Sequence, residues 1–198
     1  MTKHLIIAGV PRAGKSTVSA MLAKRYGYQH VSMDSIIAGF ERCFPETGVT
    51  TYGDMPPEEM LRGISGKMAP FLRAMMDSGE YDEREYGMVV DIYQLLPEDY
   101  VRHIDPAVCG IAYFVTAEVA AEERFRLLKR FDTPKDYTYF ESDEENLARC
   151  REIVAHSLLF RQQCGRFSLP CYETSRERER VLQEFVDSIA SGSGANGL

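Results

Sequence analysis

The chain has 198 residues and lacks the features that mark several large classes of protein. Its five cysteines are odd in number and scattered without a Cys-x-x-Cys pair, so they predict neither a zinc site nor a redox centre. No apolar run approaches the roughly 18 residues that cross a membrane, and the first apolar stretch is too short for a signal peptide. A net positive charge is also absent, because 30 acidic residues outnumber 23 lysines and arginines and the formal net charge is −7. We therefore expect a cytoplasmic protein with free thiols that binds neither nucleic acid nor membranes.

The apolar residues that are present follow the pattern of an α/β protein. They make up 44% of the chain, and five short apolar segments alternate with helical stretches. This alternation predicts a three-layer α/β/α fold around a five-stranded parallel sheet. We expect a single domain over residues 1–190, followed by a flexible tail at 191–198. The predicted strands are Leu5–Val10, Tyr28–Met33, Gly87–Asp91, Cys109–Val115 and Leu169–Tyr172.

The most specific motif follows the first predicted strand. Residues 9–16 fit the pattern Gly, four residues, Gly-Lys-Ser, and a helix begins at Lys15 and stops at Gly27. In such a phosphate loop the glycines allow a tight turn, Lys15 neutralises phosphate charge and the Ser16 hydroxyl helps to hold Mg²⁺. The helix N-terminus adds a favourable dipole for an anion. We expect nucleotide phosphates to contact Gly9, Val10, Pro11, Arg12, Ala13, Gly14, Lys15, Ser16 and Thr17.

Longer segments around the sheet predict the parts that cover a ligand. Residues 35–85 are expected to form two or three helices, which we call the flap. A charged helix over 118–130 precedes the polar and aromatic residues 131–140, which we call the lid segment. Ser142 begins a capping box for a helix that runs to about Gly165. The last helix spans Ser175–Ala190, and its charged start is typical of a solvated face.

A phosphate loop occurs in kinases, GTPases and ATP-driven machines, so further motifs must separate these classes. The Asn-Lys-x-Asp motif with which GTPases recognise guanine is absent. The third predicted strand runs Val89-Val90-Asp91-Ile92-Tyr93 and lacks the Glu that polarises water in motor and helicase ATPases. The remaining pattern resembles the small nucleotide and metabolite kinases of the adenylate kinase and shikimate kinase type, over about residues 3–190 in the order of elements.

The resemblance implies positions for the arginines that neutralise the transferring phosphoryl group. The run from Arg126 to Arg130 resembles the family's Arg-x-x-x-Arg at the leading edge of the lid, so Arg126 is expected to stack on adenine and Arg130 to contact phosphate. Arg151, after the lid segment, is a third candidate. Alternatively, Arg126 only pairs with Glu122 one turn earlier on an exposed helix. Two residues after the fifth strand are expected near the base: Thr174 and Ser175.

The acceptor side departs from adenylate kinase at two places. That family has an Arg three residues after the Asp that follows its second strand, and here Ile37 stands three residues after Asp34. Where the family has Asp-Gly-Phe-Pro-Arg at the third strand, this chain ends the corresponding run in Leu95. Both arginines that grip an acceptor phosphate are missing. This favours a hydroxyl acceptor, unless one of three flap residues replaces them: Arg42, Arg62 or Arg73.

Two carboxylates remain at the sheet edge where ligands of open α/β folds bind. Asp34 resembles the Asp of shikimate kinase and chloramphenicol phosphotransferase that contacts the acceptor hydroxyl and accepts its proton. It also fits a cap for a helix that begins at Ser35, and the two roles are compatible. Asp91 is expected to order Mg²⁺ through water or to bind the acceptor, or it simply ends a strand.

These residues together predict an ATP- and Mg²⁺-dependent phosphotransferase that moves the γ-phosphoryl group of ATP to a hydroxyl of a small metabolite. The expected catalytic residues are Lys15, Asp34, Arg130 and Arg151, and the expected metal ligands are Ser16 and Asp91. Two alternatives stay open. One is a nucleoside monophosphate kinase, and the other is an ATP-binding regulatory protein.

Overall fold

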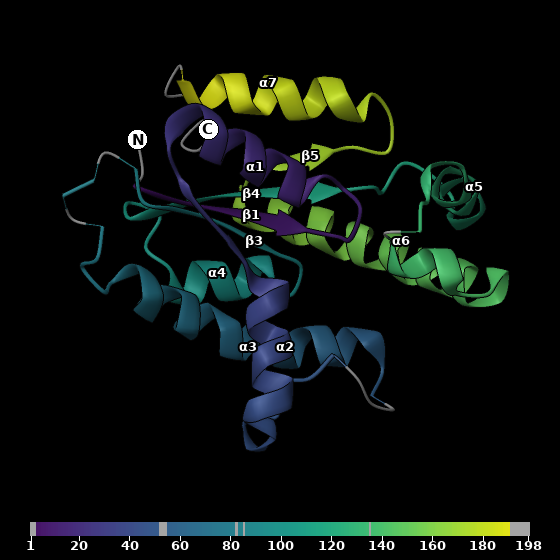
Figure 1. The fold of residues 1–198 in the computed structure, drawn as a ribbon, viewed down its shortest axis with the longest axis horizontal. Coiled ribbons are helices and arrows are strands. Elements are labelled where there is room, and N and C mark those ends of the chain that lie inside the picture. Colours follow the sequence, from purple (N-terminus) through teal and green to yellow (C-terminus); the bar gives the residue numbers. More distant parts are fainter. Residues whose placement is uncertain (1–2, 52–54, 82, 85, 135, 191–198) are drawn as a thin grey trace.

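A sheet of five parallel strands forms the middle of the molecule (Figure 1). The computed structural model describes residues 3–51, 55–81, 83–84, 86–134 and 136–190. The strands are β1 (His4–Gly9), β2 (Gln29–Ser32), β3 (Met88–Ile92), β4 (Cys109–Val115) and β5 (Cys171–Glu173). They lie in the order β2-β3-β1-β4-β5, and every neighbouring pair is parallel. The α/β class and the five-stranded parallel sheet expected from the sequence are confirmed.

Helices cover both faces of the sheet and complete the three layers. They are α1 (Lys15–Tyr26), α2 (Met33–Cys43), α3 (Pro57–Met76), α4 (Pro97–His103), α5 (Ala121–Phe131), α6 (Asp143–Phe167) and α7 (Arg178–Ala190), with short 3-10 turns η1 (Pro45–Thr47) and η2 (Tyr137–Phe140). On one face α1 packs against α7, and on the other α4 packs between α3 and α6 (Figure 1). α2 projects away from the sheet, and α5 lies beside α6 at one end of the molecule.

The three central strands are buried on both faces, which explains their continuous apolar sequences. Aromatic rings fill the space between β4, β5 and α7. The ring of Phe114 stacks on Tyr172 at 5.3 Å between centroids and meets Phe185 edge-on at 5.2 Å. This packing holds the carboxyl ends of the parallel strands at one edge, where the loops to the following helices begin.

Helix α4 was not predicted, although its sequence carries the signals of a short helix. Pro97 stands in its first turn, Glu98 and Asp99 favour the N-terminal dipole, and Arg102 and His103 lie in the last turn. Its 7 residues are too few to show a periodic apolar face, so the spacing of apolar residues did not predict this helix.

The other predicted helices are present, some with shifted ends. The first begins and ends where expected, and the capping box forms: Ser142 Oγ accepts from the Glu145 backbone N–H, and the Glu145 carboxylate accepts from the Ser142 N–H at 2.8 Å. Among its described residues, the α-helices of the flap are α2, which begins two residues before the flap, and α3. The tail predicted at 191–198 lies outside the described residues, as do residues 52–54, 82 and 85 of the flap and residue 135 of the lid segment.

Two expectations from composition can be compared with the fold. All five cysteines are free thiols: Cys43, Cys109, Cys150, Cys164 and Cys171. Within the described ranges, no helix combines the length and the apolar character that a membrane crossing requires.

Candidate active site

The phosphate loop joins β1 to α1, and its backbone requires glycine at two positions. Gly9 has φ +125°, and a Cβ there would lie 2.0 Å from the backbone oxygen of Phe114. Gly14 has φ +107°, and a Cβ there would lie 2.7 Å from Leu182 Cδ1. Because a Cβ at either position would collide with a neighbouring element, the loop packs closely against β4 and α7, and its glycines allow the positive φ with which backbone N–H groups can turn toward a phosphate. The cradle therefore fits a nucleotide phosphate.

Lys15 is buried within this cradle. The residue is 8% exposed, and its Nζ donates a hydrogen bond to the backbone oxygen of Val10 at 2.9 Å. Burial lowers the pKa of Lys15 to about 8, against the opposing effect of the carboxylates of Asp34 and Asp91. A desolvated ammonium group gains stability when an anion arrives, so a bound phosphate would favour its charged form.

Asp91 lies at the carboxyl end of β3, where side chains of β2 hold it. The residue is 1% exposed. Its Oδ2 contacts Nε2 of His30, and Ser32 Oγ donates to its Oδ1 at 3.4 Å. The strand register places Ser32 opposite Asp91, which explains this second contact. The sequence placed the carboxylate at the correct edge and missed its two partners; its role toward Mg²⁺ stays a prediction.

Asp34 lies in the first turn of α2 and belongs to the same electrostatic cluster. The helix cap predicted for it is wrong, because α2 begins at Met33 with Ser32 in the N-cap position. Desolvation raises the pKa of Asp34, the charge of Lys15 opposes that rise, and the charge of Asp91 adds to it. The carboxylate therefore holds a proton more readily than an ordinary Asp, which is a property that a general base can use.

Tyr93 connects this cluster to α6. Its ring centroid lies 5.8 Å from Lys15 Nζ, and its hydroxyl contacts Nδ1 of His156. His156 is 4% exposed, and burial lowers the pKa of its imidazole, although the nearby Glu152 opposes the shift. At neutral pH the imidazole is therefore uncharged. The sequence gave no signal for this pair, because the two residues are 63 positions apart.

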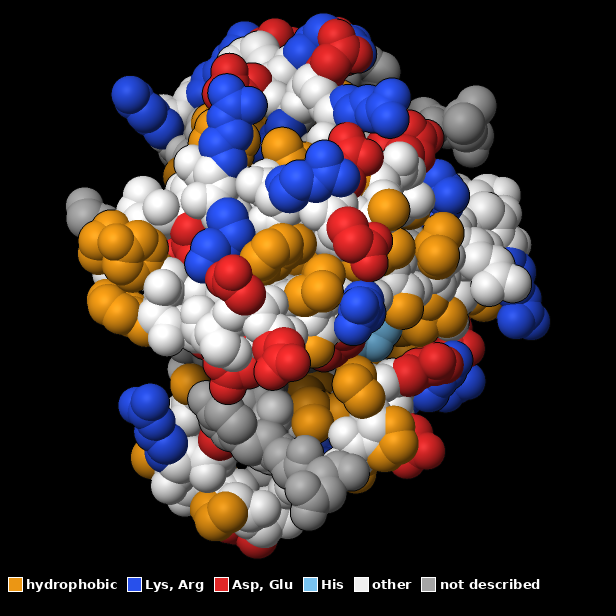
Figure 2. Space-filling view, turned by 90° about the vertical axis from the view of Figure 1, so that its right-hand side faces the viewer, with side chains coloured by type: hydrophobic (Ala, Val, Ile, Leu, Met, Phe, Trp, Pro, Cys, Tyr) orange, Lys and Arg blue, Asp and Glu red, His pale blue; other side chains and the backbone are white. Residues whose placement is uncertain are grey.

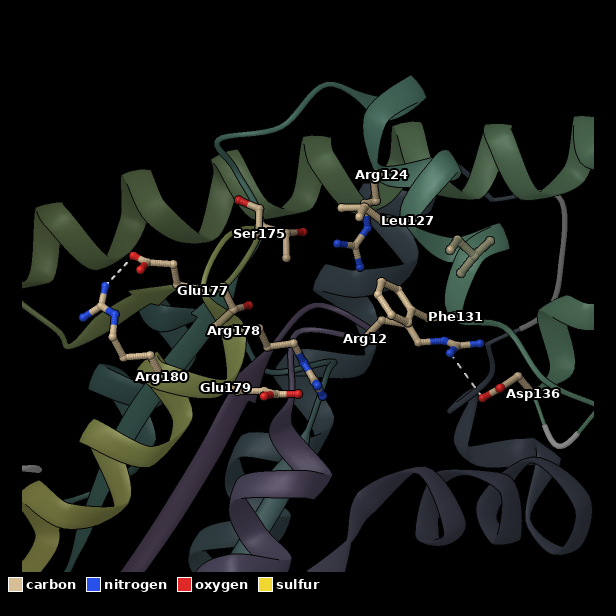
Figure 3. Close-up of a pocket in the computed structure, with 13 residues that line it drawn as sticks. Arg12, Arg124, Leu127, Phe131, Asp136, Ser175, Glu177, Arg178, Glu179 and Arg180 are labelled. Carbon is tan, nitrogen blue, oxygen red and sulfur yellow. Dashed lines mark hydrogen bonds and ion pairs between the residues drawn. The ribbon is translucent and has the colours of Figure 1, made fainter.

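A cavity of about 900 Å³ lies on the β4 and β5 side of the phosphate loop (Figure 3). Its size is within the range of pockets that hold small organic ligands. Figure 3 shows four arginines around it, Arg12 from the phosphate loop, Arg124 from α5, and Arg178 and Arg180 from α7, and we call it the arginine cavity. It is lined by Arg12, Thr116, Arg124, Leu127, Leu128, Phe131, Asp136, Thr174, Ser175, Glu177, Arg178, Glu179 and Arg180.

Arg124 of α5 is a cavity residue that the sequence motif missed. It is 8% exposed, and its Nη2 donates to the backbone oxygen of Pro11 at 2.7 Å, so it ties α5 to the phosphate loop. Arg126 follows about 200° further around the helix. It is exposed and turns its Nε back to the backbone oxygen of Glu122 at 3.3 Å. The i, i+4 pair that faces the cavity is therefore Arg124 and Leu128, and the structure does not bring Arg126 there.

The two other predicted arginines also lie outside the cavity lining. Arg130 is exposed, with its guanidinium 5.3 Å from the ring centroid of Phe131. Arg151 is exposed on α6, with its Nη2 3.9 Å from Glu122 Oε1. Contact of either arginine with a phosphate stays a prediction.

Thr174 and Ser175 line the arginine cavity, at the place that their position after β5 predicts. The backbone N–H of Thr174 donates to the oxygen of Val115 at 2.8 Å, which holds this turn against the end of β4. The Ser175 hydroxyl contacts the Glu173 carboxylate. Their expected contact with a base stays a prediction.

The charged start of α7 is only partly the solvated face that was predicted. Arg180 pairs with Glu177 at 2.7 Å and with Glu184 at 2.8 Å, as expected for such a face. Arg178 instead approaches the first turn of α1, where its Nη2 donates to Thr17 Oγ1 at 3.3 Å. The alternating charges of the sequence do not distinguish Arg178 from Arg180. Their different contacts depend on which face of α7 meets the phosphate loop.

Arg12 is bound by the lid segment. Its Nη2 donates to Asp132 Oδ1 at 2.6 Å and to Thr138 Oγ1 at 2.7 Å, and its Nη1 lies 3.2 Å from Asp136 Oδ1 (Figure 3). The backbone of Arg12 has φ +63°, a conformation that residues with a side chain seldom adopt. In this structure the lid segment is therefore docked on the phosphate loop.

The carboxyl edge of the sheet carries charges of both signs (Figure 2) and a hydroxyl group that fits a role in holding Mg²⁺. In Figure 2, which faces this edge, many Lys and Arg side chains gather over the upper part, interspersed with Asp and Glu. Among the described residues, no group of three or more His, Cys, Asp or Glu is arranged to hold a metal ion. Mg²⁺ beside a nucleotide commonly uses one or two protein oxygens together with phosphates and waters. The exposed Ser16 hydroxyl at the start of α1 fits that smaller role.

Comparisons with known proteins identify the fold. No family model and no curated protein matches the sequence. Among solved structures, a gluconokinase from Sinorhizobium meliloti 1021 is 13% identical with a TM-score of 0.52, and the match covers 95% of this chain and 91% of that one. A sugar kinase from Janibacter sp. HTCC2649 is 14% identical with a TM-score of 0.53, covering 96% and 95%. A shikimate kinase from Acinetobacter baumannii, in complex with shikimate, is 15% identical with a TM-score of 0.55, covering 97% and 95%.

These identities are low, so the likeness shows a shared fold. The chain has the phosphate-loop kinase fold of these small-molecule kinases, and the resemblance to shikimate kinase expected from the sequence is confirmed at that level. A shared fold supports many activities, so function must be argued from the site.

Proposed function

We propose that the protein is an ATP- and Mg²⁺-dependent kinase that transfers the γ-phosphoryl group of ATP to a hydroxyl group of a small molecule. The observation that carries the proposal is Lys15, an ammonium group buried inside a loop whose shape requires glycine at positions 9 and 14. A loop that binds no ligand gains nothing from a desolvated charge at this point. The names of the three similar structures, all small-molecule kinases, support the same activity.

The arginine cavity is the proposed site of the nucleotide. Three of its four arginines, Arg12, Arg124 and Arg178, lie on the phosphate loop or beside it, where they would neutralise the triphosphate and the charge that develops during transfer. The cavity also offers apolar side chains on which a base can pack, and these come from α5: Leu127, Leu128 and Phe131.

Phosphoryl transfer requires positioning and neutralised charge more than covalent chemistry from the protein. Lys15 would exchange its hydrogen bond to the Val10 carbonyl for one to a phosphate oxygen. Asp34, with its raised pKa, would accept the proton of the attacking hydroxyl. Mg²⁺, which the Ser16 hydroxyl and the phosphates would hold, supplies further neutralisation of the transferring group.

The groups beside Lys15 favour a hydroxyl acceptor over an acceptor phosphate. Asp34 and Asp91 both act on Lys15 electrostatically, so two carboxylates lie on this side of the loop. Tyr93 and the uncharged His156 add hydrogen-bonding capacity without positive charge. A phosphate-bearing acceptor would meet repulsion from the carboxylates, whereas a hydroxyl group would find a proton acceptor.

A coupled ADP-release screen tests this proposal. Sugars, other small hydroxylated metabolites, nucleosides and nucleoside monophosphates are offered with ATP and Mg²⁺, and Lys15→Ala serves as the inactive control. We expect ADP release that depends on a hydroxylated acceptor and is lost in the variant. ATP binding without any acceptor-dependent turnover would indicate a regulatory nucleotide-binding protein instead.

A further inference from the structure

The four arginines of the arginine cavity have different partners in this structure. Arg124 donates to the backbone of the phosphate loop, and Arg178 donates to a hydroxyl of α1. Two of the four are held by carboxylates: Arg180 by its chain neighbours Glu177 and Glu184, and Arg12 by Asp132 and Asp136 of the lid segment, of which Asp132 lies 120 positions away in the sequence. The partners of Arg12 are thus anions, the same class of group that a nucleotide would bring into the cavity.

The lid carboxylates around Arg12 are arranged for capture of a guanidinium group. The Asp132 side chain is 4% exposed, and its Oδ1 receives both Arg12 Nη2 and the hydroxyl of Thr138. Its Oδ2 is buried and has no hydrogen-bond partner among the described residues. A buried carboxylate with one unsatisfied oxygen depends on its cation, because without it the charge would stay desolvated and uncompensated.

The second carboxylate links the guanidinium to the fold of the lid segment. Asp136 Oδ2 accepts from the backbone N–H of Thr133 at 2.9 Å and from its hydroxyl at 2.7 Å, so Asp136 organises the turn that also presents Asp132. These hydrogen bonds and the charge of Arg12 lower the pKa of Asp136, which keeps it ionised at neutral pH. Removal of the Arg12 side chain would therefore take the cation away from two carboxylates of the lid segment, Asp132 and Asp136.

We propose that Arg12 exchanges anionic partners: the lid carboxylates Asp132 and Asp136 hold its guanidinium in the nucleotide-free protein, and the triphosphate displaces them when ATP binds. The inference rests on the proposed function, because it takes the arginine cavity as the nucleotide site. It assigns to the Arg12 side chain a phosphate contact that the loop motif itself does not require, since the loop binds through its backbone N–H groups, Lys15 and Ser16.

The exchange couples the nucleotide to the lid segment. When Arg12 turns to a phosphate, the buried Asp132 loses its cation and must be rehydrated, so the lid segment has to leave the position that it holds here. Because the lid carboxylates and the triphosphate compete for Arg12, any change that weakens the hold of the lid on Arg12 strengthens triphosphate binding, by at most the same factor. The lid carboxylates thus act as competitors of ATP for one guanidinium group.

The test measures the affinity of a non-hydrolysable ATP analogue with Mg²⁺ by calorimetry. Asp136→Asn should tighten binding about 3- to 10-fold, because it weakens the competing ion pair, and Arg12→Gly should weaken binding about 10-fold or more. Glycine is chosen because it accepts the φ of +63° at this position. In the double variant, Asp136→Asn should no longer change the affinity, because its effect acts through Arg12.

Two controls separate the exchange from a general loss of structure. Asp187→Asn removes the charge of a comparable surface pair, Arg25 with Asp187, outside the lining of the arginine cavity, and it should leave the affinity unchanged. Hydrogen exchange of residues 131–134 and 136–140 should increase in Arg12→Gly without nucleotide, and in the wild type on addition of the analogue. Asp136 is the primary variant because Asp132 is buried and its replacement is more harmful to folding.

The outcomes are distinct. Tighter binding by Asp136→Asn that disappears without Arg12 supports the exchange. Unchanged or weaker binding in a folded Asp136→Asn protein overturns it, because the contact would then only shape the loop. Failure of the wild-type protein to bind the analogue at all would instead overturn the proposed function.

Discussion

The carboxyl edge of the sheet carries the candidate active site and has two halves. They meet at the phosphate loop and differ in charge. Toward β4 and β5 the arginine cavity is lined by four arginines and by three acidic residues, two of which pair with arginines of the lining in this structure. Toward β2 and β3 the described groups linked to Lys15 are the carboxylates of Asp34 and Asp91 and the ring of Tyr93. The first half suits a polyanion, and the second suits a hydroxyl that must lose a proton. On the function proposed above, this difference in charge would place the donor and the acceptor on opposite sides of Lys15.

The largest expected effect comes from the acceptor half. Asp34→Asn should lower the rate of transfer about 100- to 10,000-fold with unchanged ATP affinity, because an amide cannot accept the hydroxyl proton. Since the pKa of Asp34 is raised, the wild-type rate should fall as pH decreases through a value above the ordinary carboxyl range. A pH–rate profile checks this. If the acid limb persists in Asp34→Asn, another group is the base.

Lys15 stands between the halves, and its loss should affect both. Lys15→Ala should reduce transfer about 100- to 1,000-fold, because a preorganised positive charge at the transferring group is removed. Thermal stability should hold, since the folded protein disfavours the charged form of this buried lysine. The matched control is Lys24→Ala on the exposed face of the same helix. Steady-state rates and melting curves of the two variants measure these effects. Near-normal turnover in a folded Lys15→Ala protein would contradict the assignment of the phosphate loop as the site of transfer.

A comparison of two arginines on α5 sharpens the account of the nucleotide half. Arg124→Gln should weaken ATP binding about 10-fold, because a cavity cation is lost. Arg126→Gln should change it less than about twofold, because Arg126 is exposed and lies outside the cavity lining. Binding measured by calorimetry gives both values. The opposite ranking would restore Arg126 as the residue that stacks on the base.

The smallest expected effect concerns base selectivity. ATP with Mg²⁺ should raise the melting temperature, because a ligand that binds only the native state stabilises it by mass action. GTP with Mg²⁺ should raise it less, since the sequence lacks the guanine-recognition motif of GTPases. Thermal shift at equal nucleotide concentrations measures the difference. Equal shifts would show that the cavity does not distinguish the bases.

Sequence patterns predicted the parts of the fold that depend on local order. The alternation of strands and helices predicted the parallel sheet, and the glycine spacing predicted a loop that the backbone of Gly9 and Gly14 confirms. Helix α4 was not predicted, because its 7 residues form fewer than two helical turns. The cap assigned to Asp34 was wrong because α2 starts two residues earlier than expected, at Met33.

The parts of the candidate site that the sequence did not predict depend on contacts between residues far apart in the sequence. Arg12 and Asp132 are 120 positions apart, so no local pattern links them. On α5 the sequence showed several arginines, but helical phase relative to the phosphate loop decides which one enters the cavity, and Arg124 does so. The arginine spacing alone contains no information on that phase.

The most direct test of the division between the two halves compares acceptors at fixed ATP and Mg²⁺. kcat/KM is measured for AMP, CMP and UMP and for the best hydroxylated acceptor from the screen, with each phosphorylated product identified by mass spectrometry. The account predicts transfer to the hydroxylated compound that is at least about 100-fold more efficient than transfer to any monophosphate, because carboxylates beside Lys15 repel a second phosphate. Efficient transfer to a monophosphate, retained in Asp34→Asn, would contradict it.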